Sequence, residues 1–394
     1  MDSQDKNRDR TGVAERERTP GALKPKAGRF YSASSARRGL SVGATAAVLM
    51  LALVACAGGG TSANMPSGSA SDGATDPASD ETTGSGLGDE PCDFTFSALT
   101  GLDASQVADY AAVDAMREAG CTIKVETLLQ SDLVAQGVVQ NRYQIVLTGS
   151  TSFFILAQQG EPVVMLAERS GNDWAMLGET GLKDCHDVMD AKSLGVPGLS
   201  SVGGAVASYW FNQECADLEA PFVAVPGGPQ RAQALLSGQI ATSVLPMADA
   251  LTLLREAPDK IELMANFAET VPQLITYATW SNSKWVEENP NTVKLFMRLK
   301  LEEHRKIAGD PEYLIELMDR YKADVAPEDV EKVAEFVATS QIFDPNGGVA
   351  PEDVAFTIDL FQAGGAIDPE PKIDPDGIVA RDLLDEVLDE IGRE

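Results

Sequence analysis

The chain has 394 residues, of which 60 are acidic and 31 are basic, and its formal net charge is −29. This length allows two domains, and an apolar content of 44% is enough for a sizeable core. The negative charge argues against nucleic-acid binding, which needs a basic surface to displace counterions from phosphates. The two histidines, His186 and His304, lie far apart in the sequence, so we expect neither a histidine-rich metal site nor a cofactor.

The N-terminal segment has the pattern of an export signal. Residues 40–55 carry no charge and follow Arg37 and Arg38. A helix of this length spans about 24 Å, which is shorter than the ~30 Å core of a bilayer. Residues 53–56, Leu-Val-Ala-Cys, resemble a bacterial lipobox. That resemblance implies that residues 1–55 are removed as a signal peptide and that Cys56 receives a lipid. An ordinary signal peptide or a buried helix is the alternative, and the secretion route stays open.

Residues 56–91 are predicted to form a flexible tether. Nearly all of the residues after Cys56 are Gly, Ser, Thr, Ala, Asp or Pro, so the segment has too few apolar side chains to form a core. A lipid anchor followed by a tether predicts a protein held at the outer face of a bacterial cell membrane.

Four cysteines follow Cys56, and an even number in an exported chain favours two disulfides. Cys92 and Cys121 each begin a β-rich run. If these runs are neighbouring parallel strands, both cysteines lie at the same edge of the sheet. Cys185 precedes a short predicted strand, and Cys215 ends the helix after it. We therefore predict the pairs Cys92–Cys121 and Cys185–Cys215.

The body alternates strands with helices, in the pattern of a parallel sheet covered on both faces. The first strands are predicted at 92–99, 121–128, 143–147 and 162–167, with helices at 104–119 and 132–139 and one that ends at 159. The pattern then restarts with strands at 193–196, 222–225 and 240–245, and helices that end at 211, 236 and 255. From residue 284 onward the chain is predicted to be helical.

This restart predicts an α/β fold of two lobes, each a mostly parallel sheet flanked by helices. The first lobe is assigned to residues 92–168 and 265–394, including the C-terminal helices, and the second lobe to residues 169–264.

Ligands of open parallel sheets bind beyond the carboxyl ends of the strands. At these positions the chain has glycines and hydroxyl residues before helices, which bring main-chain N–H groups and hydroxyls to a ligand. The candidate ligand-binding residues are Thr100, Gly101, Asp103, Thr148, Ser150, Thr151, Gly198, Ser200, Ser201, Gly203, Pro246 and Met247. The alternative is that these segments are only turns and helix caps.

Four segments carry a resemblance to a known family: 111–120 (AAVDAMREAG), 144–151 (QIVLTGST), 235–244 (LLSGQIATSV) and 285–294 (WVEENPNTVK). Over residues 92–365 the chain resembles the periplasmic-type substrate-binding proteins of ABC importers. The closest subgroup binds nitrate, sulfonates, taurine or thiamine-pyrimidine precursors. Many relatives have an acid where Ala241 stands, so no role is transferred to that position.

The resemblance implies a type II periplasmic-binding-protein fold, in which two hinged lobes close on a small-molecule ligand. It also implies a monomer that delivers its ligand to an ABC permease and its ATPase, and that catalyses no reaction. A ligand-sensing receptor or, as a lesser alternative, an enzyme on the same fold stays open.

Asp103 and Asp249 would favour a cationic or donor-rich ligand, and Arg169 and Arg231 lie near the candidate segments. The aromatic candidates for stacking a ring are Tyr110, Trp174, Tyr209, Trp210 and Phe267. We expect a neutral or heteroaromatic organic solute rather than nitrate.

Overall fold

The computed structural model describes residues 87, 88, 90–99 and 101–394. The expected signal segment, Cys56, most of the tether and Thr100 lie outside the described residues. The described residues belong to one unit, residues 77–394.

The first sheet has five strands in the order β2-β1-β3-β10-β4. They are β1 (Asp93–Leu99), β2 (Thr122–Leu128), β3 (Ile145–Gly149), β4 (Val163–Ser170) and β10 (Tyr277–Asn282). Strand β10 is antiparallel to both of its neighbours, and the other four strands run in one direction.

The second sheet also has five strands, in the order β7-β6-β8-β5-β9. They are β5 (Trp174–Glu179), β6 (Leu194–Val196), β7 (Phe222–Ala224), β8 (Thr242–Pro246) and β9 (Ile261–Asn266). Here β5 is the antiparallel strand. The prediction of two mostly parallel sheets is therefore confirmed. The sequence analysis did not predict β5, β9 or β10.

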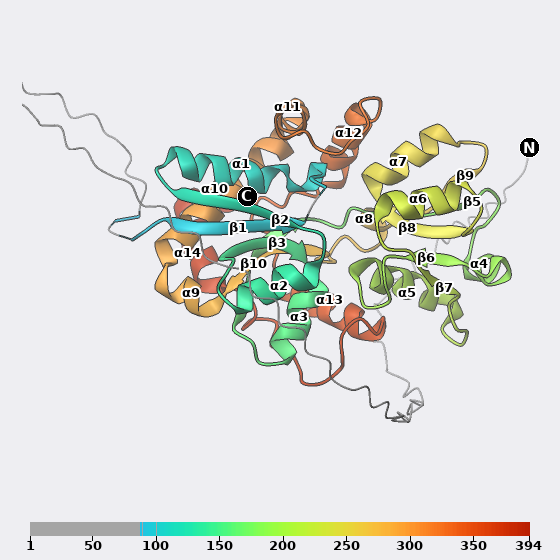
Figure 1. The fold of residues 1–394 in the computed structure, drawn as a ribbon, viewed down its shortest axis with the longest axis horizontal. Coiled ribbons are helices and arrows are strands. Elements are labelled where there is room, and N and C mark those ends of the chain that lie inside the picture. Colours follow the sequence, from blue (N-terminus) through green and yellow to red (C-terminus); the bar gives the residue numbers. More distant parts are fainter. Residues whose placement is uncertain (1–86, 89, 100) are drawn as a thin grey trace, which may run out of the picture. The chain divides into compact units, whose positions relative to one another are not determined.

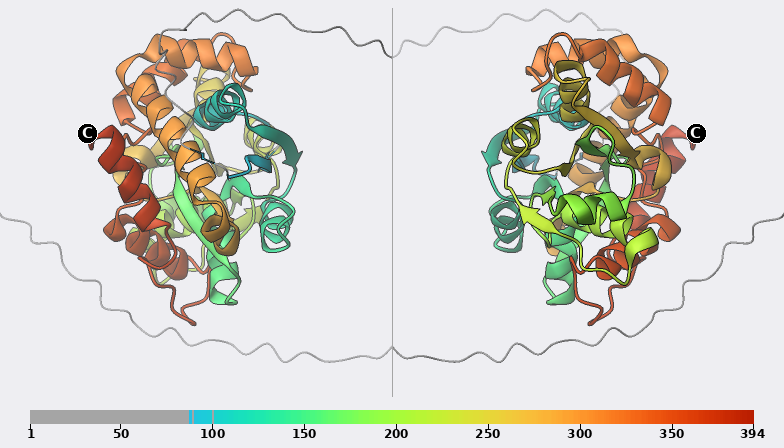
Figure 2. Two further views of the ribbon diagram at one scale, coloured as in Figure 1. Left: turned by 90° about the vertical axis from the view of Figure 1, so that its left-hand side faces the viewer. Right: turned by 90° about the vertical axis from the view of Figure 1, so that its right-hand side faces the viewer.

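Helices cover both faces of each sheet (Figures 1 and 2). Right-handed crossovers place helices α1 (Val107–Glu118) and α2 (Ser131–Val139) on opposite faces of the first sheet. In the second sheet, α5 (Val202–Cys215) likewise lies opposite α6 (Gly228–Leu236) and α7 (Met247–Glu256). The remaining elements up to residue 288 are the 3-10 helix η1 (Ala104–Gln106), α3 (Ser150–Gln158), α4 (Cys185–Ala191), α8 (Phe267–Thr270) and α9 (Ser283–Glu288).

The C-terminal part is helical, as predicted. Its helices are α10 (Pro290–Gly309), α11 (Pro311–Tyr321), α12 (Val330–Ser340), α13 (Pro351–Ala363) and α14 (Arg381–Ile391). Helices α10 and α11 pack on α1, and α14 packs on α10 and β4, whereas α12 contacts α7 and α13 contacts α5. Helix α12 also packs on α10 and α11, and Phe361 of α13 packs against Phe154 of α3, so these two helices contact both the first lobe and helices of the second sheet.

The contacts of α12 and α13 with the second sheet's helices are specific. Before α12, the buried Asp329 accepts a hydrogen bond from Nε of Arg255, at the end of α7, at 2.8 Å. On the other face of the sheet, the rings of Tyr209 in α5 and Phe356 in α13 pack edge to face, with centroids 6.4 Å apart. The C-terminal helices therefore bridge to both faces of the second sheet.

Two crossovers connect the sheets, through residues 171–173 between β4 and β5 and residues 267–276 between β9 and β10. The first crossover thus joins the end of β4 to the start of β5, and the second joins the end of β9 to the start of β10. Among the helices that the structure describes, none is both long and apolar enough to cross a membrane.

The core of the first sheet contains a buried ion pair as well as stacked aromatic rings. Phe153 stacks on Trp280 with ring centroids 4.7 Å apart. Nζ of Lys300 in α10 donates to Oδ1 of Asp109 in α1 at 2.7 Å, and neither side chain is exposed to solvent. Thr279 of β10 donates a second hydrogen bond to the same carboxylate, at 3.1 Å. This pair attaches both helices to the sheet.

The cysteines lie in two close pairs. The sulfur atoms are 2.03 Å apart for Cys92 and Cys121, and 1.95 Å apart for Cys185 and Cys215. The first pair connects the beginnings of β1 and β2, which lie side by side in parallel register. The second pair connects the start of α4 to the end of α5.

Candidate functional site

The predicted ligand-binding segments meet in pairs across the two sheets. Asp103, before η1, and Met247, at the start of α7, line the same small cavity of about 20 Å³. A Cβ atom placed on Gly149, at the end of β3, would lie 3.4 Å from the side chain of Val202, the first residue of α5. The carboxyl ends of the strands in one sheet therefore face those in the other.

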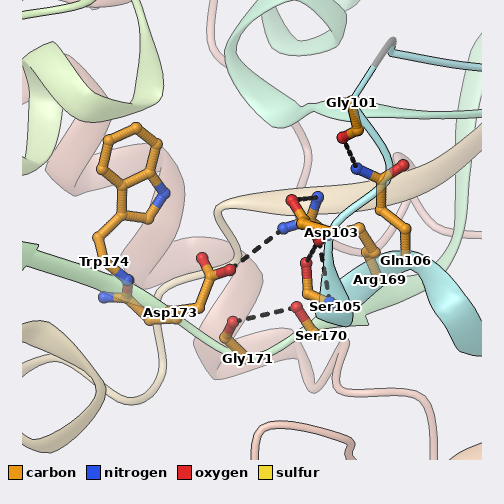
Figure 3. Close-up of polar contacts among 10 residues, drawn as sticks. Gly101, Asp103, Ser105, Gln106, Arg169, Ser170, Gly171, Asp173 and Trp174 are labelled. Carbon is orange, nitrogen blue, oxygen red and sulfur yellow. Dashed lines mark hydrogen bonds and ion pairs between the residues drawn. The ribbon is translucent and has the colours of Figure 1, made fainter. Parts of the chain in front are cut away.

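A buried arginine lies at the centre of this region. Arg169, near the end of β4, is 3% exposed. Its Nη1 lies 3.8 Å from Oδ2 of Asp103, and its Nη2 lies 3.5 Å from Oδ2 of Asp173 in the first crossover. Figure 3 shows the guanidinium group between these two carboxyl groups. One cation is thus shared by two acids.

Two aromatic rings border the arginine. The guanidinium carbon of Arg169 lies 4.0 Å from the centre of the Tyr277 ring, at the start of β10, a cation–π contact. The ring of Trp174, at the start of β5, is parallel to Tyr277 within 3°, with centroids 6.5 Å apart. Each lobe therefore contributes one flat aromatic ring to this region.

A second arginine and a third acid belong to the second sheet. Arg231 of α6 is buried, and its Nε and Nη1 donate to the main-chain oxygens of Val244 and Val225, each at 3.1 Å. Asp249 lies in the first turn of α7. The guanidinium of Arg231 is thus already engaged with the main chain.

Excess negative charge and burial shift the ionisation of these groups. The pKa of Asp173 is raised to about 6, and burial is the main cause. Asp103 adds to this rise, and Arg169 opposes it. Burial also raises the pKa of Asp249 to about 6, and Asp103 adds to this rise. Burial raises the pKa of Tyr277 to about 12. We name Asp103, Arg169, Asp173, Trp174, Arg231, Asp249 and Tyr277 the Arg169 cluster.

Polar atoms in and beside the Arg169 cluster are buried without a hydrogen-bond partner. They are Oγ1 of Thr148, Oγ of Ser150, Nε of Arg169, Oδ1 of Asp173, Nε1 of Trp174 and Oγ1 of Thr276. Buried polar atoms in native proteins are nearly always hydrogen-bonded to protein or to bound molecules. This concentration of donors and acceptors fits a site that contacts a polar ligand.

The predicted site residues differ in their surroundings. Thr148, Ser150, Thr151, Gly203 and Met247 are buried, Asp103, Gly198, Ser201 and Pro246 are partly buried, and Gly101 and Ser200 are exposed. The exposed pair therefore does not join the buried set.

The loop before α5 depends on its small residues. Oγ of Ser201 caps α5 by accepting from the N–H of Gly204 at 3.1 Å, and it donates to the carbonyl of Gly198 at 2.7 Å. A Cβ atom at Gly204 would overlap that same carbonyl oxygen. Glycine is therefore required at this position for the loop to fold back on the helix.

Sequence reasoning missed Asp173 and Tyr277. Asp173 follows the polar turn of residues 170–172 at the end of an apolar strand, a signal that could have identified it. Tyr277 has no such signal, because its position depends on the register of β10, which pairs it with Gly149 and Ser170.

The aromatic expectation requires correction. Tyr209, Trp210 and Phe267 line a separate cavity of about 490 Å³ between α5 and β9. Tyr110 packs against Phe96 and Tyr321, with ring centroids 5.7 Å and 5.9 Å away. Of the five aromatic candidates, only Trp174 belongs to the Arg169 cluster.

One group of possible metal ligands stands out among the described residues. The ligand atoms of Cys185, His186 and Cys215 all lie within 4.8 Å of one another. The two sulfurs are at disulfide distance, and a disulfide sulfur is not a thiolate. In this geometry the group therefore lacks the ligands that zinc prefers.

A match to a known family agrees with this architecture. The sequence model of the NMT1/THI5-like family matches residues 117–313, half of the chain. The chain belongs to the NMT1/THI5-like family. The matched region of this NMT1/THI5-like chain includes Arg169, Asp173 and Tyr277 of the Arg169 cluster. No curated protein sequence matches the chain.

Solved structures share the fold of this NMT1/THI5-like protein. The periplasmic nitrate-binding protein NrtA from Synechocystis PCC 6803 has a TM-score of 0.63 at 12% identity, over 77% of this chain and 90% of that chain. The aliphatic sulphonate binding protein SsuA from Escherichia coli has a TM-score of 0.57 at 12% identity, over 75% and 99% of the two chains.

A ligand-binding component of an ABC-type import system from Staphylococcus aureus, with zinc bound, has a TM-score of 0.60 at 10% identity, over 75% and 98%. These similarities confirm the predicted family resemblance and the predicted fold class.

Proposed function

We propose that the chain is the extracytoplasmic solute-binding component of an ABC importer. In this proposal it captures a small organic solute where the strand ends of its two sheets face each other, and it delivers the solute to a membrane permease powered by an ATPase. Family membership and the shared fold support the proposal. Capture requires only that the solute contacts both lobes and so favours the closed arrangement.

The observation that carries this proposal is the set of buried polar atoms without partners around Arg169. The hydroxyl of Ser150, the indole N–H of Trp174 and a carboxylate oxygen of Asp173 come from the first lobe, the second lobe and the crossover between them. A solute that hydrogen-bonds to all three would connect the lobes. Each such bond in a dry site contributes about 1 kcal/mol or more.

The charges of the Arg169 cluster favour a cationic or donor-rich ligand over an anion. Three carboxyl groups stand against two guanidinium groups, and Arg169 already faces Asp103 and Asp173. Arg231 donates to main-chain oxygens. Arg169 keeps one unpartnered donor, Nε, but its charge is already shared by two carboxyl groups, so an anion such as nitrate would gain little net attraction there. We therefore propose a planar solute with N–H donors, whose ring contacts Trp174 or Tyr277.

Titration calorimetry of the purified protein tests both parts. The panel contains an aminopyrimidine, taurine, an alkanesulfonate and nitrate. We expect the aminopyrimidine to bind with micromolar affinity, about −8 kcal/mol, and Trp174→Ala to weaken that binding at least about tenfold. Trp210→Ala, which lies in the separate cavity, is the matched control and should bind normally. Tight binding of nitrate alone would contradict the ligand class, and no binding by any member would count against solute capture.

The export features complete the proposal. Cys56 is lipidated after removal of residues 1–55, the protein is tethered as a monomer at the outer face of the membrane, and the two cysteine pairs are oxidised. In cells, Cys56→Ala should move the protein from the membrane fraction to the soluble fraction. Mass spectrometry of the non-reduced protein should find no free thiol at the four remaining cysteines, and a free thiol would contradict the disulfides.

A further inference from the structure

A second cavity lies beside the two crossovers that connect the sheets. Its volume is about 210 Å³, and its lining includes Gly171 and Asn172 from the first crossover, and Ala268, Pro272 and Gln273 from the second crossover and the short helix that begins it. The rest of the lining comes from Glu168 in β4, the segment after α12 and the start of α13. We call it the crossover cavity.

The crossover cavity is distinct from the Arg169 cluster. Strand β4 has a register shift here, because Ser170 pairs with Tyr277 and Glu168 pairs with the next residue, Ala278; the contacts of Glu168 and Arg169, and not strand alternation, therefore separate the two side chains. Arg169 contacts Asp103, Asp173 and Tyr277, whereas Glu168 lines the crossover cavity.

Glu168 is the unusual residue of this cavity. It is only 6% exposed, yet among the described residues its carboxylate has no hydrogen bond and no ion pair within reach. Its main-chain N–H donates to the carbonyl of Gly347 at 2.8 Å, which holds it in place. A Cβ atom at Gly348, where φ is +62°, would overlap Oε2 of Glu168, so a glycine loop closes over the carboxylate.

Other acidic groups surround Glu168. Asp344 and Asp353 line the same cavity. Burial raises the pKa of Glu168 well above its ordinary value, and these two carboxylates raise it further, more than Lys300 and Arg169 lower it. No described cation contacts this carboxyl group, so its ionised form costs free energy, and a cation bound in the cavity would offset that cost.

The spacing of the acids distinguishes among cations. Calcium binds six to eight oxygens at about 2.3–2.6 Å, so its carboxylate ligands lie close to one another. Among the described residues, the three acids of this cavity are not close enough together to hold a metal ion between them. An organic cation with donors on two separated nitrogens can hydrogen-bond to more widely spaced oxygens. The cavity is large enough to hold a small cation of this kind.

We propose that the crossover cavity binds a small organic cation with N–H donors on two nitrogens, of the guanidinium, amidinium or short diamine class, and that Glu168 is its main anionic contact. The site goes beyond the proposed solute capture, because it uses none of the residues of the Arg169 cluster.

The test is calorimetry of the purified protein without added solute, with methylguanidinium, putrescine, Ca²⁺ and Mg²⁺ at constant ionic strength. We expect saturable one-site binding of methylguanidinium or putrescine in the wild type. Glu168→Gln should weaken it at least about tenfold, because a buried charge pair is lost. Glu118→Gln, an exposed acid on α1, should not change it.

Trp174→Ala separates this proposal from solute capture. It should abolish or weaken aminopyrimidine binding but leave cation binding unchanged. Three results would each overturn the cation site: no binding of either amine at millimolar concentration, binding of Ca²⁺ or Mg²⁺ instead, or equal binding by Glu168→Gln.

Discussion

Replacing Asp249 by asparagine should make the ligand-free protein more stable at neutral pH. The pKa of Asp249 is raised from 3.8 to about 6, chiefly by burial and then by Asp103. The folded state therefore holds a proton on this group more tightly than the unfolded chain does. Above pH 6 the group is ionised in both states, and the folded state alone bears the cost of the buried charge.

The size of the effect follows from the pKa. A rise of about two pH units corresponds to about 3 kcal/mol of free energy of unfolding at neutral pH. Because Asp249 is partly exposed and lies in the first turn of α7, where the helix dipole favours a negative charge, we expect about 1–3 kcal/mol. Asparagine cannot ionise, so Asp249→Asn removes this cost.

Urea unfolding at several pH values measures the prediction. The stability gain of Asp249→Asn should be close to zero below the ordinary pKa of an aspartate. It should grow as the pH rises towards 6 and stay constant above that, at an unchanged m-value. Asp217→Asn, an exposed acid after α5, should show no such dependence. A gain that is the same at every pH, or a loss of stability at neutral pH, would refute the reasoning.

Three further substitutions test other parts of the structure. Lys300→Met should destabilise the fold by about 3–5 kcal/mol because it leaves Asp109 buried and unpaired, and Lys300→Met with Asp109→Asn should recover much of that loss in thermal unfolding. Cys215→Ser should lower the free energy of unfolding in denaturant by about 3–4 kcal/mol if the Cys185–Cys215 disulfide forms, because the closed loop spans 30 residues. Equal stability of the wild type and Cys215→Ser without reductant would contradict this disulfide. Gly204→Ala should lower stability by about 1–3 kcal/mol and weaken aminopyrimidine binding in calorimetry. Gly309→Ala, at the end of α10 with open space around it, should not lower stability and should leave binding unchanged.

Local patterns predicted the parallel strands but not the antiparallel ones. The runs that form β1, β2, β3 and β4 are apolar or β-rich and are bounded by turn residues and helices, so each can be identified from its own residues. Strand β10 pairs with β3 and β4, more than 100 residues earlier in the chain. Such a pairing is stabilised by its partners, and a short segment taken alone contains little sign of it.

The same limit applies to the candidate site. Asp103, Thr148 and Ser150 follow predicted strands, so their place at the strand ends was predictable. Tyr277 begins an antiparallel strand, which brings its N-terminal end to the edge where the parallel strands terminate. The packing between the lobes decides whether an arginine near that edge contacts an acidic side chain or stays available to a ligand. The contact of Arg169 with both Asp103 and Asp173 could therefore not be predicted from the sequence.

The helices that bridge to the second sheet restrict how solute can exchange. Besides the two crossovers, α12 contacts the second sheet through α7 on one face, and α13 contacts it through α5 on the other. A movement of one sheet relative to the other therefore has to change at least one of these contacts. In the proposed solute capture, opening of the lobes would therefore change the Arg255–Asp329 or the Tyr209–Phe356 contact.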